Sequence, residues 1–239
     1  MVDSRLHRGP DLEDAQNFGP DQLATLCAAV ADLSWLLDHG YAEHSSLALV
    51  GNRYSLRDRQ RQAVGRCSCS SAARELRLAH RVGPAEVAGQ CVLIDGFNVL
   101  TTVELALGGG VLLVGCDGVM RDIVGLRGSY RLVAETRPAI DLIGRQLKAF
   151  GVREARWLLD RPVSNSGRLR DLLLEVAGEL GVAWTVMLES NPDPELRGSR
   201  EIVATADSAI LERCLRWFGL AGLVVECSVP EAWVIKLGL

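Results

Sequence analysis

The chain of 239 residues contains no long hydrophobic run. Its richest apolar windows, around 92–94, 111–114, 157–159 and 222–225, are three to five residues long, whereas a membrane-spanning helix needs about 18 apolar residues. Residues 1–14 are polar and mixed in charge, which is not the pattern of a secretory signal peptide. The sequence therefore predicts a soluble, cytoplasmic protein without a membrane partner.

Paired metal-binding cysteines are also scarce. The chain has seven cysteines, but only Cys67 and Cys69 form a close pair, and no second pair follows at the spacing of a zinc site. Cys91, Cys116 and Cys214 lie within apolar segments and are predicted to be small core residues. Structural zinc is therefore not favoured, and the pattern leaves the role of Cys67 and Cys69 open.

Lysine is almost absent, with two in the whole chain, so arginine carries the positive charge. The net charge of −4 argues against general affinity for nucleic acids, yet eight arginines and only two acids lie between residues 53 and 81. Arg53, Arg57 and Arg61 recur every four residues beside Tyr54. Such a set predicts contact with nucleic acid, because arginines neutralise phosphates and aromatic rings stack on bases. A solvated helix face, or pairing with acids of the second domain, is the alternative.

The character of the sequence changes between residues 85 and 90. Residues 1–85 predict a small helical domain, with helices at about 20–39, 55–65 and 70–82. Residues 90–239 alternate between apolar runs, expected as strands at 91–94, 111–116, 155–159, 182–188, 202–204 and 222–227, and helical patterns at about 98–107, 137–150, 166–180 and 208–218. This alternation predicts an α/β fold with a Rossmann-like, mostly parallel sheet flanked by helices.

Four of the expected strands are each followed by an aspartate, namely Asp95, Asp117, Asp160 and Asp207. The carboxyl ends of parallel strands lie on one edge of a sheet, where ligands bind. Two carboxylates about 4 Å apart repel by roughly 4 kcal/mol at an effective dielectric of 20, so a cluster indicates a divalent cation. Oxygen ligands favour Mg²⁺ or Mn²⁺. Each aspartate taken alone is equally explained as a helix cap or turn residue.

A polar segment follows Asp160 and opens the helix expected at 166–180. Ser164, Asn165 and Ser166 are all good helix caps, and Arg168 adds a positive charge. Free backbone N–H groups at a helix start bind anions. The segment therefore predicts a phosphate contact, with an ordinary cap followed by an exposed basic helix as the alternative.

Residues 92–98, which end in Asp95-Gly96-Phe97-Asn98, resemble the first strand of PIN-like nucleases, especially the NYN branch. Residues 205–210, which contain Asp207 and Ser208, are similar to the late acidic segment of that superfamily. The resemblance implies a PIN-like sheet, a Mg²⁺ or Mn²⁺ site of three or four acids, and cleavage of RNA.

Carried over residue by residue, the resemblance implies that Asp95 and Asp207 are metal ligands and that Asp160 is the mid-chain acid. Asn98 matches the asparagine that follows the first strand, and Glu104 is a candidate extra acid. Asp117 matches no position of the PIN pattern, and Asp122 comes five residues after it with no assigned role.

The whole chain also resembles an uncharacterised prokaryotic family that joins a helical domain of unknown function to a PIN-like domain. Residues 35–41, 50–54 and 162–167 carry this second resemblance, which brings little function with it.

We therefore expect a metal-dependent endoribonuclease, in which Asp95, Asp160 and Asp207 hold Mg²⁺ or Mn²⁺ while Asn98, Ser208 and the 164–168 segment contact the substrate. A PIN-like module that binds RNA or a protein without cutting it is the alternative. An aspartate-nucleophile phosphatase is disfavoured, because Phe97 stands where that chemistry needs a second acid. The RNA substrate and a homo-oligomeric state stay undecided.

Overall fold

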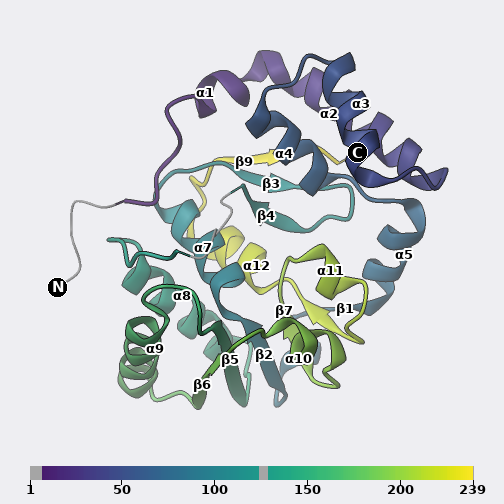
Figure 1. Ribbon diagram of the computed structural model, residues 1–239. Coiled ribbons are helices and arrows are strands. Elements are labelled where there is room, and N and C mark those ends of the chain that lie inside the picture. The colour runs from purple at the N-terminus through teal and green to yellow at the C-terminus, as the bar shows by residue number, and fades with distance from the viewer. Residues whose placement is uncertain (1–6, 124–128, 239) are drawn as a thin grey trace.

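A six-stranded sheet forms the centre of the protein. The computed structural model describes residues 7–123 and 129–238. In this part of the chain, helices pack on both faces of the central sheet, and a smaller three-stranded sheet lies between it and the N-terminal helices (Figure 1). The α/β fold with a mostly parallel sheet, expected from the alternating pattern, is confirmed.

All neighbouring strands of the central sheet are parallel. From edge to edge they are β1 (Arg81–Val82), β8 (Trp217–Phe218), β7 (Ile202–Ala204), β2 (Cys91–Asp95), β5 (Glu154–Asp160) and β6 (Trp184–Glu189). Asp95 pairs with Leu158, so β5 continues past the end of β2 and finishes at Asp160. The carboxyl ends of β2, β5 and β7 therefore lie side by side on one edge.

The residues of β2 alternate between two cores, as a strand buried on both faces requires. Val92 and Ile94 pack with four long helices, and Leu93 packs on the opposite face with two short ones. The long helices are α7 (Gly96–Leu107), α8 (Thr136–Ala149), α9 (Ser166–Leu180) and α12 (Leu220–Ser228). The short helices are α10 (Asp193–Gly198) and α11 (Ser208–Leu211), and α6 (Pro84–Val87) precedes β2.

In the described residues from position 7 onward, five helices form the N-terminal part, which we call the helical unit. They are α1 (Asp14–Asn17), α2 (Pro20–Asp38), α3 (Glu43–Arg53), α4 (Asp58–Cys67) and α5 (Ser71–His80). The longest, α2, starts with Pro20 in its first turn and buries Leu26, Ala29, Val30 and Leu33, an apolar stripe at helical spacing. Gly40, at a φ of 77°, follows its end in the left-handed conformation that glycine favours.

The helical unit shares its core with the second sheet. That sheet has the order β4 (Met120–Asp122), β3 (Leu112–Val114) and β9 (Val234–Lys236), with β3 antiparallel to β4 and parallel to β9. Leu33 and Val64 of the helices pack in one cluster with Leu113 and Ile235 of the sheet. The boundary expected near residue 85 therefore separates two sequence patterns, while the hydrophobic core continues across it.

Two expected elements of the α/β part are wrong, and a third is a strand as expected but lies in the other sheet. Residues 222–227 lie in α12, because a short buried apolar run has the same composition in a helix as in a strand. The helix expected at 208–218 ends at Leu211, and Trp217 and Phe218 instead form β8. The strand expected at 111–116 is β3, which belongs to the second sheet and not to the central one.

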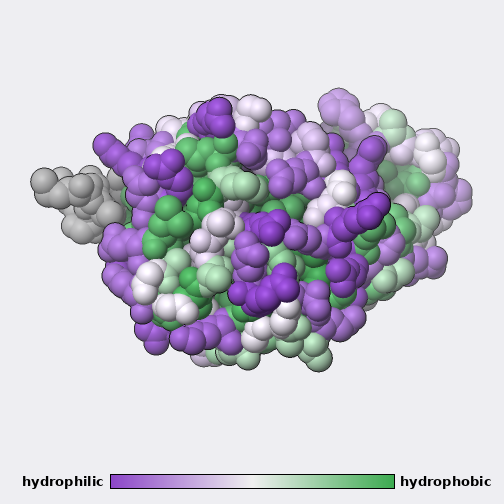
Figure 2. Space-filling model, turned by 90° about the horizontal axis from the view of Figure 1, so that it is seen from below, coloured by the Kyte–Doolittle hydropathy of each residue, from purple (hydrophilic) through white to green (hydrophobic). Residues whose placement is uncertain are grey.

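On the face seen from below, hydrophobic residues form small groups separated by hydrophilic ones (Figure 2). Among the helices that the structure describes, none combines the length and apolar character needed to cross a membrane.

Candidate functional site

The carboxyl edge of the central sheet opens into a cleft of about 560 Å³. Its walls come from the ends of β2 and β7, the first turns of α7, α10 and α11, and from β4 and α4. The lining residues are Arg66, Asp95, Asn98, Thr101, Thr102, Arg121, Asp122, Asp193, Ala206, Asp207, Ser208 and Ala209. Two of the three expected acids, together with Asn98 and Ser208, thus lie around one hollow.

Asp95 lies at the junction of β2 and α7, and its side chain does not cap that helix. The carboxylate instead accepts a hydrogen bond from Thr205 Oγ1, at 2.7 Å from Oδ2. Burial raises the pKa of Asp95 to about 7, and the charges of Asp207, Asp160 and Asp193 add to the rise, against the lowering effect of Thr205. The helix-cap interpretation therefore does not explain this aspartate.

Asn98 and Gly96 explain the spacing of the motif at the start of α7. Asn98 Oδ1 accepts a hydrogen bond from the backbone N–H of Ala206 at 2.8 Å, which fixes the loop after β7 against α7. A Cβ at position 96 would lie 2.8 Å from the backbone oxygen of Leu158, so only glycine lets the helix start this close to β5. The motif thus brings the residues around Asp207 next to Asp95.

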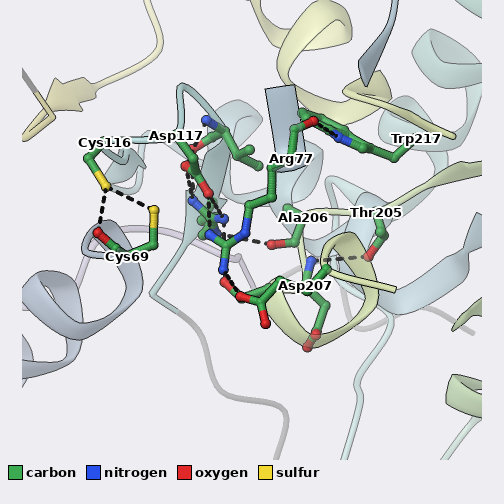
Figure 3. Close-up of polar contacts among 12 residues, drawn as sticks. Cys69, Arg77, Cys116, Asp117, Thr205, Ala206, Asp207 and Trp217 are labelled. Atoms are coloured by element: carbon green, nitrogen blue, oxygen red, sulfur yellow. Dashed lines mark hydrogen bonds and ion pairs between the residues drawn. The ribbon is translucent and has the colours of Figure 1, made fainter. Parts of the chain in front are cut away.

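Asp207 has two roles in the geometry of the cleft. Its Oδ1 accepts hydrogen bonds from the backbone N–H groups of Ala209 and Ile210, at 2.8 and 3.2 Å, and so caps α11. Its own N–H donates to Thr205 Oγ1 at 3.1 Å (Figure 3). Because Thr205 also donates to Asp95, one threonine hydroxyl connects Asp207 to Asp95. The cap interpretation is correct for Asp207, and the residue is exposed at the cleft all the same.

Asp160 lies at the end of β5, beside β2, and is not part of the cleft wall. Burial first, and then the charge of Asp193, raise the pKa of Asp160. Asp160 in turn contributes to the raised pKa of Asp95, so the two belong to one acidic group.

Asp193, which the sequence analysis missed, lines the cleft at the start of α10 and pairs with Arg197 at 2.7 Å. Its position shortly after the expected strand 182–188 was the signal that could have identified it.

The opposite wall of the cleft comes from β4 and the helical unit. Asp122 Oδ2 accepts hydrogen bonds from the hydroxyls of Thr101 and Thr102, at 3.0 and 3.2 Å. Arg66 of α4 donates to the backbone oxygen of Asp122 at 2.8 Å, and its side chain is 40% exposed. The helical unit thus places a positive charge opposite the acids of the central sheet.

Asp117 does not belong to this acidic group. It follows β3 of the second sheet, and Arg77 and Arg121 bind its two oxygens at 2.6 to 2.8 Å (Figure 3). These arginines outweigh the effect of burial and lower the pKa of Asp117. A carboxylate already neutralised by two buried guanidinium groups has no need of a cation, so we remove Asp117 from the candidate metal ligands.

The basic residues around position 57 do not share one helical face, because α3 ends at Arg53 and α4 begins at Asp58. Arg61 donates to the backbone oxygens of Leu56 and Ala48 and to Asn52 Oδ1, so it stabilises the α3–α4 turn. Arg57 reaches Asn17 Oδ1 at 3.3 Å.

Arg53 and Tyr54 instead lie together beside Asp32. The Arg53 side chain is 70% exposed and lies over the Tyr54 ring, whose hydroxyl donates to Asp32 at 2.9 Å. Of the three arginines expected to contact nucleic acid, Arg53 and Arg57 are exposed and Arg61 is half-buried.

Ser164 and Asn165, before α9, hold the backbone around Tyr130 in place. Ser164 Oγ bonds to the backbone N–H and oxygen of Tyr130, at 3.0 and 3.1 Å, and Asn165 Nδ2 donates to the same oxygen at 2.7 Å. Ser166 Oγ donates to the backbone oxygen of Arg161. These polar side chains therefore form hydrogen bonds within the fold and do not line the cleft. Arg168 is exposed, and it is the residue of the segment that could contact a phosphate.

Glu104 is not an additional acid of the cleft. Glu104 belongs to α7, and its fully buried carboxylate accepts hydrogen bonds from Tyr130 and Thr136 and pairs with Arg8 at 2.6 Å. Burial, which outweighs these partners, raises the pKa of Glu104.

Within residues 7–123 and 129–238, no three His, Cys, Asp or Glu side chains are grouped closely enough to enclose a metal ion by themselves. The acids of the cleft interact through their charges, but their carboxylates do not form a preformed cage. Among the described residues, no arginine or lysine forms an ion pair with Asp95, Asp160 or Asp207. Because the carboxylates form no closed cage among the described residues, a cation bound here would keep part of its water shell.

Comparison with known proteins identifies two family models. Residues 84–223, more than half of the chain, match the model described as "Domain of unknown function (DUF5616)", and residues 25–80 match "Protein of unknown function (DUF434)". No PIN or NYN family is identified. Uncharacterized protein MJ0935 of Methanocaldococcus jannaschii is 30% identical over 186 residues, which cover 77% of this chain and 88% of that protein. No solved structure matches.

Proposed function

We propose that this chain, which belongs to the family described as "Domain of unknown function (DUF5616)", is a metal-dependent ribonuclease that hydrolyses phosphodiester bonds in the cleft. One observation carries the proposal: Asp95 lies in a cleft with Asp193 and Asp207, and burial, together with the charges of the neighbouring acids, raises its pKa to about 7. The Asp-Gly-x-Asn motif and its resemblance to the first strand of NYN nucleases favour this chemistry over other uses of an acidic cleft.

A bound divalent cation would neutralise the repulsion between the acids of the cleft. Buried like charges persist when a cation neutralises them, and the donors available in the cleft are oxygens, which suit Mg²⁺ or Mn²⁺. Mg²⁺ does not require a closed cage of protein ligands, because this ion keeps several waters and uses only one or two carboxylates together with substrate phosphates. When bound, such an ion neutralises charge and activates water for attack on a phosphodiester.

The acids of the cleft and the residues that position them have different roles in this proposal. Asp95 and Asp207 hold the cation, and Asp160 and Asp193 add negative charge that strengthens its binding. Asn98 and Thr205 position Asp95 and Asp207 relative to each other through the hydrogen bonds described above.

Positive charge for the substrate backbone comes from the other wall. Arg66 faces the cleft from α4 with a partly exposed guanidinium group, and Ser208 lines the floor beside Asp207. Arg53, Tyr54 and Arg168 lie outside the cleft, so their contacts would be with more distant parts of an RNA.

Substitution of Asp95 by Asn tests the proposal, because it keeps the shape of the side chain and removes the charge. We expect the rate of cleavage of single-stranded or transfer RNA, measured with millimolar Mg²⁺ or Mn²⁺, to fall by at least about 100-fold, which corresponds to roughly 3 kcal/mol of transition-state stabilisation. Asp171→Asn is the matched control, since Asp171 is on the exposed surface of α9. Equal rates for the wild type and Asp95→Asn would refute the proposed site.

A module that binds RNA or a protein without cleavage is the second candidate. It is favoured by the use of Asp207 Oδ1 as a helix cap and by the lack of a preformed cage among the described residues. Titration of the protein with labelled single-stranded RNA at millimolar Mn²⁺ separates the two. Binding with no product after prolonged incubation supports the second candidate, and product that disappears in Asp95→Asn supports the first.

A further inference from the structure

Two cysteines from different parts of the chain meet at the joint between the helical unit and the α/β part. Cys69 lies in the loop between α4 and α5, and Cys116 in the loop between β3 and β4. Their sulfur atoms are 3.2 Å apart, and both cysteines are free thiols (Figure 3). The sequence analysis placed Cys116 in the core, whereas the structure leaves its side chain partly accessible.

The surrounding backbone keeps these two sulfurs close. The N–H of Cys116 donates to the backbone oxygen of Cys67 at 2.8 Å, which ties the loop that carries Cys116 to the end of α4, two residues before Cys69. The adjacent Asp117 is fixed by Arg77, a residue of α5. A disulfide has an S–S length of about 2.05 Å, so the two sulfurs need to approach by only about 1 Å.

We propose that Cys69 and Cys116 form a redox-active dithiol, which a hydroperoxide oxidises to a disulfide that joins the helical unit to the α/β part. Among the described residues, no third ligand joins the pair to make a metal site. Cys67 is not a partner, because its thiol is buried and burial raises its pKa to about 12. The proposal is independent of the ribonuclease function proposed above.

The two cysteines differ in a way that assigns their roles. The hydrogen bond from Cys69 lowers the pKa of Cys116, while the same contact and burial raise the pKa of Cys69. Cys69 is 6% exposed, and Cys116 is the more accessible of the two. Cys116 is therefore the thiolate that meets the oxidant, and Cys69 is the resolving thiol.

The reaction balances in two steps. The Cys116 thiolate attacks one oxygen of hydrogen peroxide, the O–O bond breaks, and a sulfenic acid and hydroxide form. The Cys69 thiol then attacks the sulfenic sulfur, the S–S bond forms, and the sulfenic hydroxyl leaves as water after it takes up the thiol proton. Two thiols are oxidised, and one peroxide is reduced to two waters. The bond would fix α4, which carries Arg66, against the loop that leads into β4.

The test uses the full chain, reduced and then freed of reductant. One equivalent of hydrogen peroxide is added, the protein is denatured, and the remaining thiols are labelled with N-ethylmaleimide and counted by intact mass. We expect the wild type to lose two of its seven thiols, with a mass decrease of two hydrogens. Seven labels after treatment would overturn the proposal.

Peptide mapping places the link. The tryptic peptide 67–74 contains Cys67 as well as Cys69, and the peptide 82–121 contains Cys91 as well as Cys116, so fragment ions must assign the bond to Cys69 and Cys116. A bond that joins Cys67 to Cys69 or to Cys116 would contradict the proposal. This measurement needs no variant, so it holds even where a substitution disturbs folding.

Three variants complete the design. Cys116→Ser is expected to prevent the loss of two thiols, and Cys69→Ser to stop the reaction at a sulfenic acid on Cys116, which dimedone labels. Cys227→Ser removes an exposed cysteine and is the matched control, in which the link forms as in the wild type. Loss of two thiols in Cys116→Ser would refute the pairing.

Discussion

Asp95 is predicted to destabilise the folded protein when it is ionised and no cation is present. Its pKa rises from the ordinary value of 3.8 to about 7 on folding, chiefly through burial, so the folded state holds the proton more tightly than the unfolded chain does. Each pKa unit corresponds to 1.36 kcal/mol, so the full shift corresponds to about 4 kcal/mol. Because Asp95 keeps partial access to the cleft, we expect a measured effect of about 2 to 4 kcal/mol.

The sign of the pH dependence follows from proton binding. Between about pH 4 and pH 7 the folded state binds more protons at Asp95 than the unfolded state, so the free energy of unfolding falls as the pH rises through this window. Asp95→Asn removes this dependence and keeps an oxygen that accepts the hydrogen bond from Thr205. The variant should therefore be more stable than the wild type above about pH 7, by about 2 to 4 kcal/mol, and the difference should shrink toward pH 4.

Urea denaturation in the presence of a chelator, followed by circular dichroism at several pH values, measures this difference. Asp171→Asn, which removes an exposed carboxylate, should change the free energy of unfolding by no more than about 1 kcal/mol. Millimolar Mn²⁺ in place of the chelator should stabilise the wild type and leave Asp95→Asn unchanged, because binding to the folded state alone raises its stability. The reasoning is refuted if Asp95→Asn is no more stable than the wild type at about pH 8 without metal.

Three further predictions concern the parts that position the cleft. Arg77→Gln removes one of the buried ion-pair partners of Asp117 and should lower the free energy of unfolding by about 3 to 5 kcal/mol in urea titrations. Asn98→Ala removes the acceptor of the Ala206 N–H and should cost about 1 to 3 kcal/mol, with faster hydrogen exchange at that amide. Gly96→Ala places a methyl group against the backbone of β5 and should lower the melting temperature through a loss of about 1 to 3 kcal/mol.

The sequence was most informative where a local pattern has a single structural solution. The run from Cys91 to Ile94 is apolar at every position, which fits a strand covered on both faces, and Asp95 marks its carboxyl end. The stripe along α2 likewise indicated a helix that buries one side. Period and turn chemistry act between near neighbours, so these elements are visible without knowledge of the rest of the chain.

Membership of a sheet could not be predicted in this way. Asp117 follows an apolar strand just as Asp95 does, but β3 pairs with β4 and β9 and not with the central sheet. Arg77, from α5, then neutralises Asp117 across 40 residues of sequence. Strand pairing and ion pairing depend on contacts between distant segments, which no local pattern records.

The sequence by itself determined the type of fold, the position of Asp95 and Asn98 at the end of a buried strand, and the pattern break near residue 85. Only the tertiary structure decided which acids meet, because the parallel order of β7, β2 and β5 places their carboxyl ends together, and α10 brings Asp193 to the same edge. It also decided that Cys69 and Cys116 lie in contact, since two loops 47 positions apart are joined there by the packing of the helical unit on the second sheet.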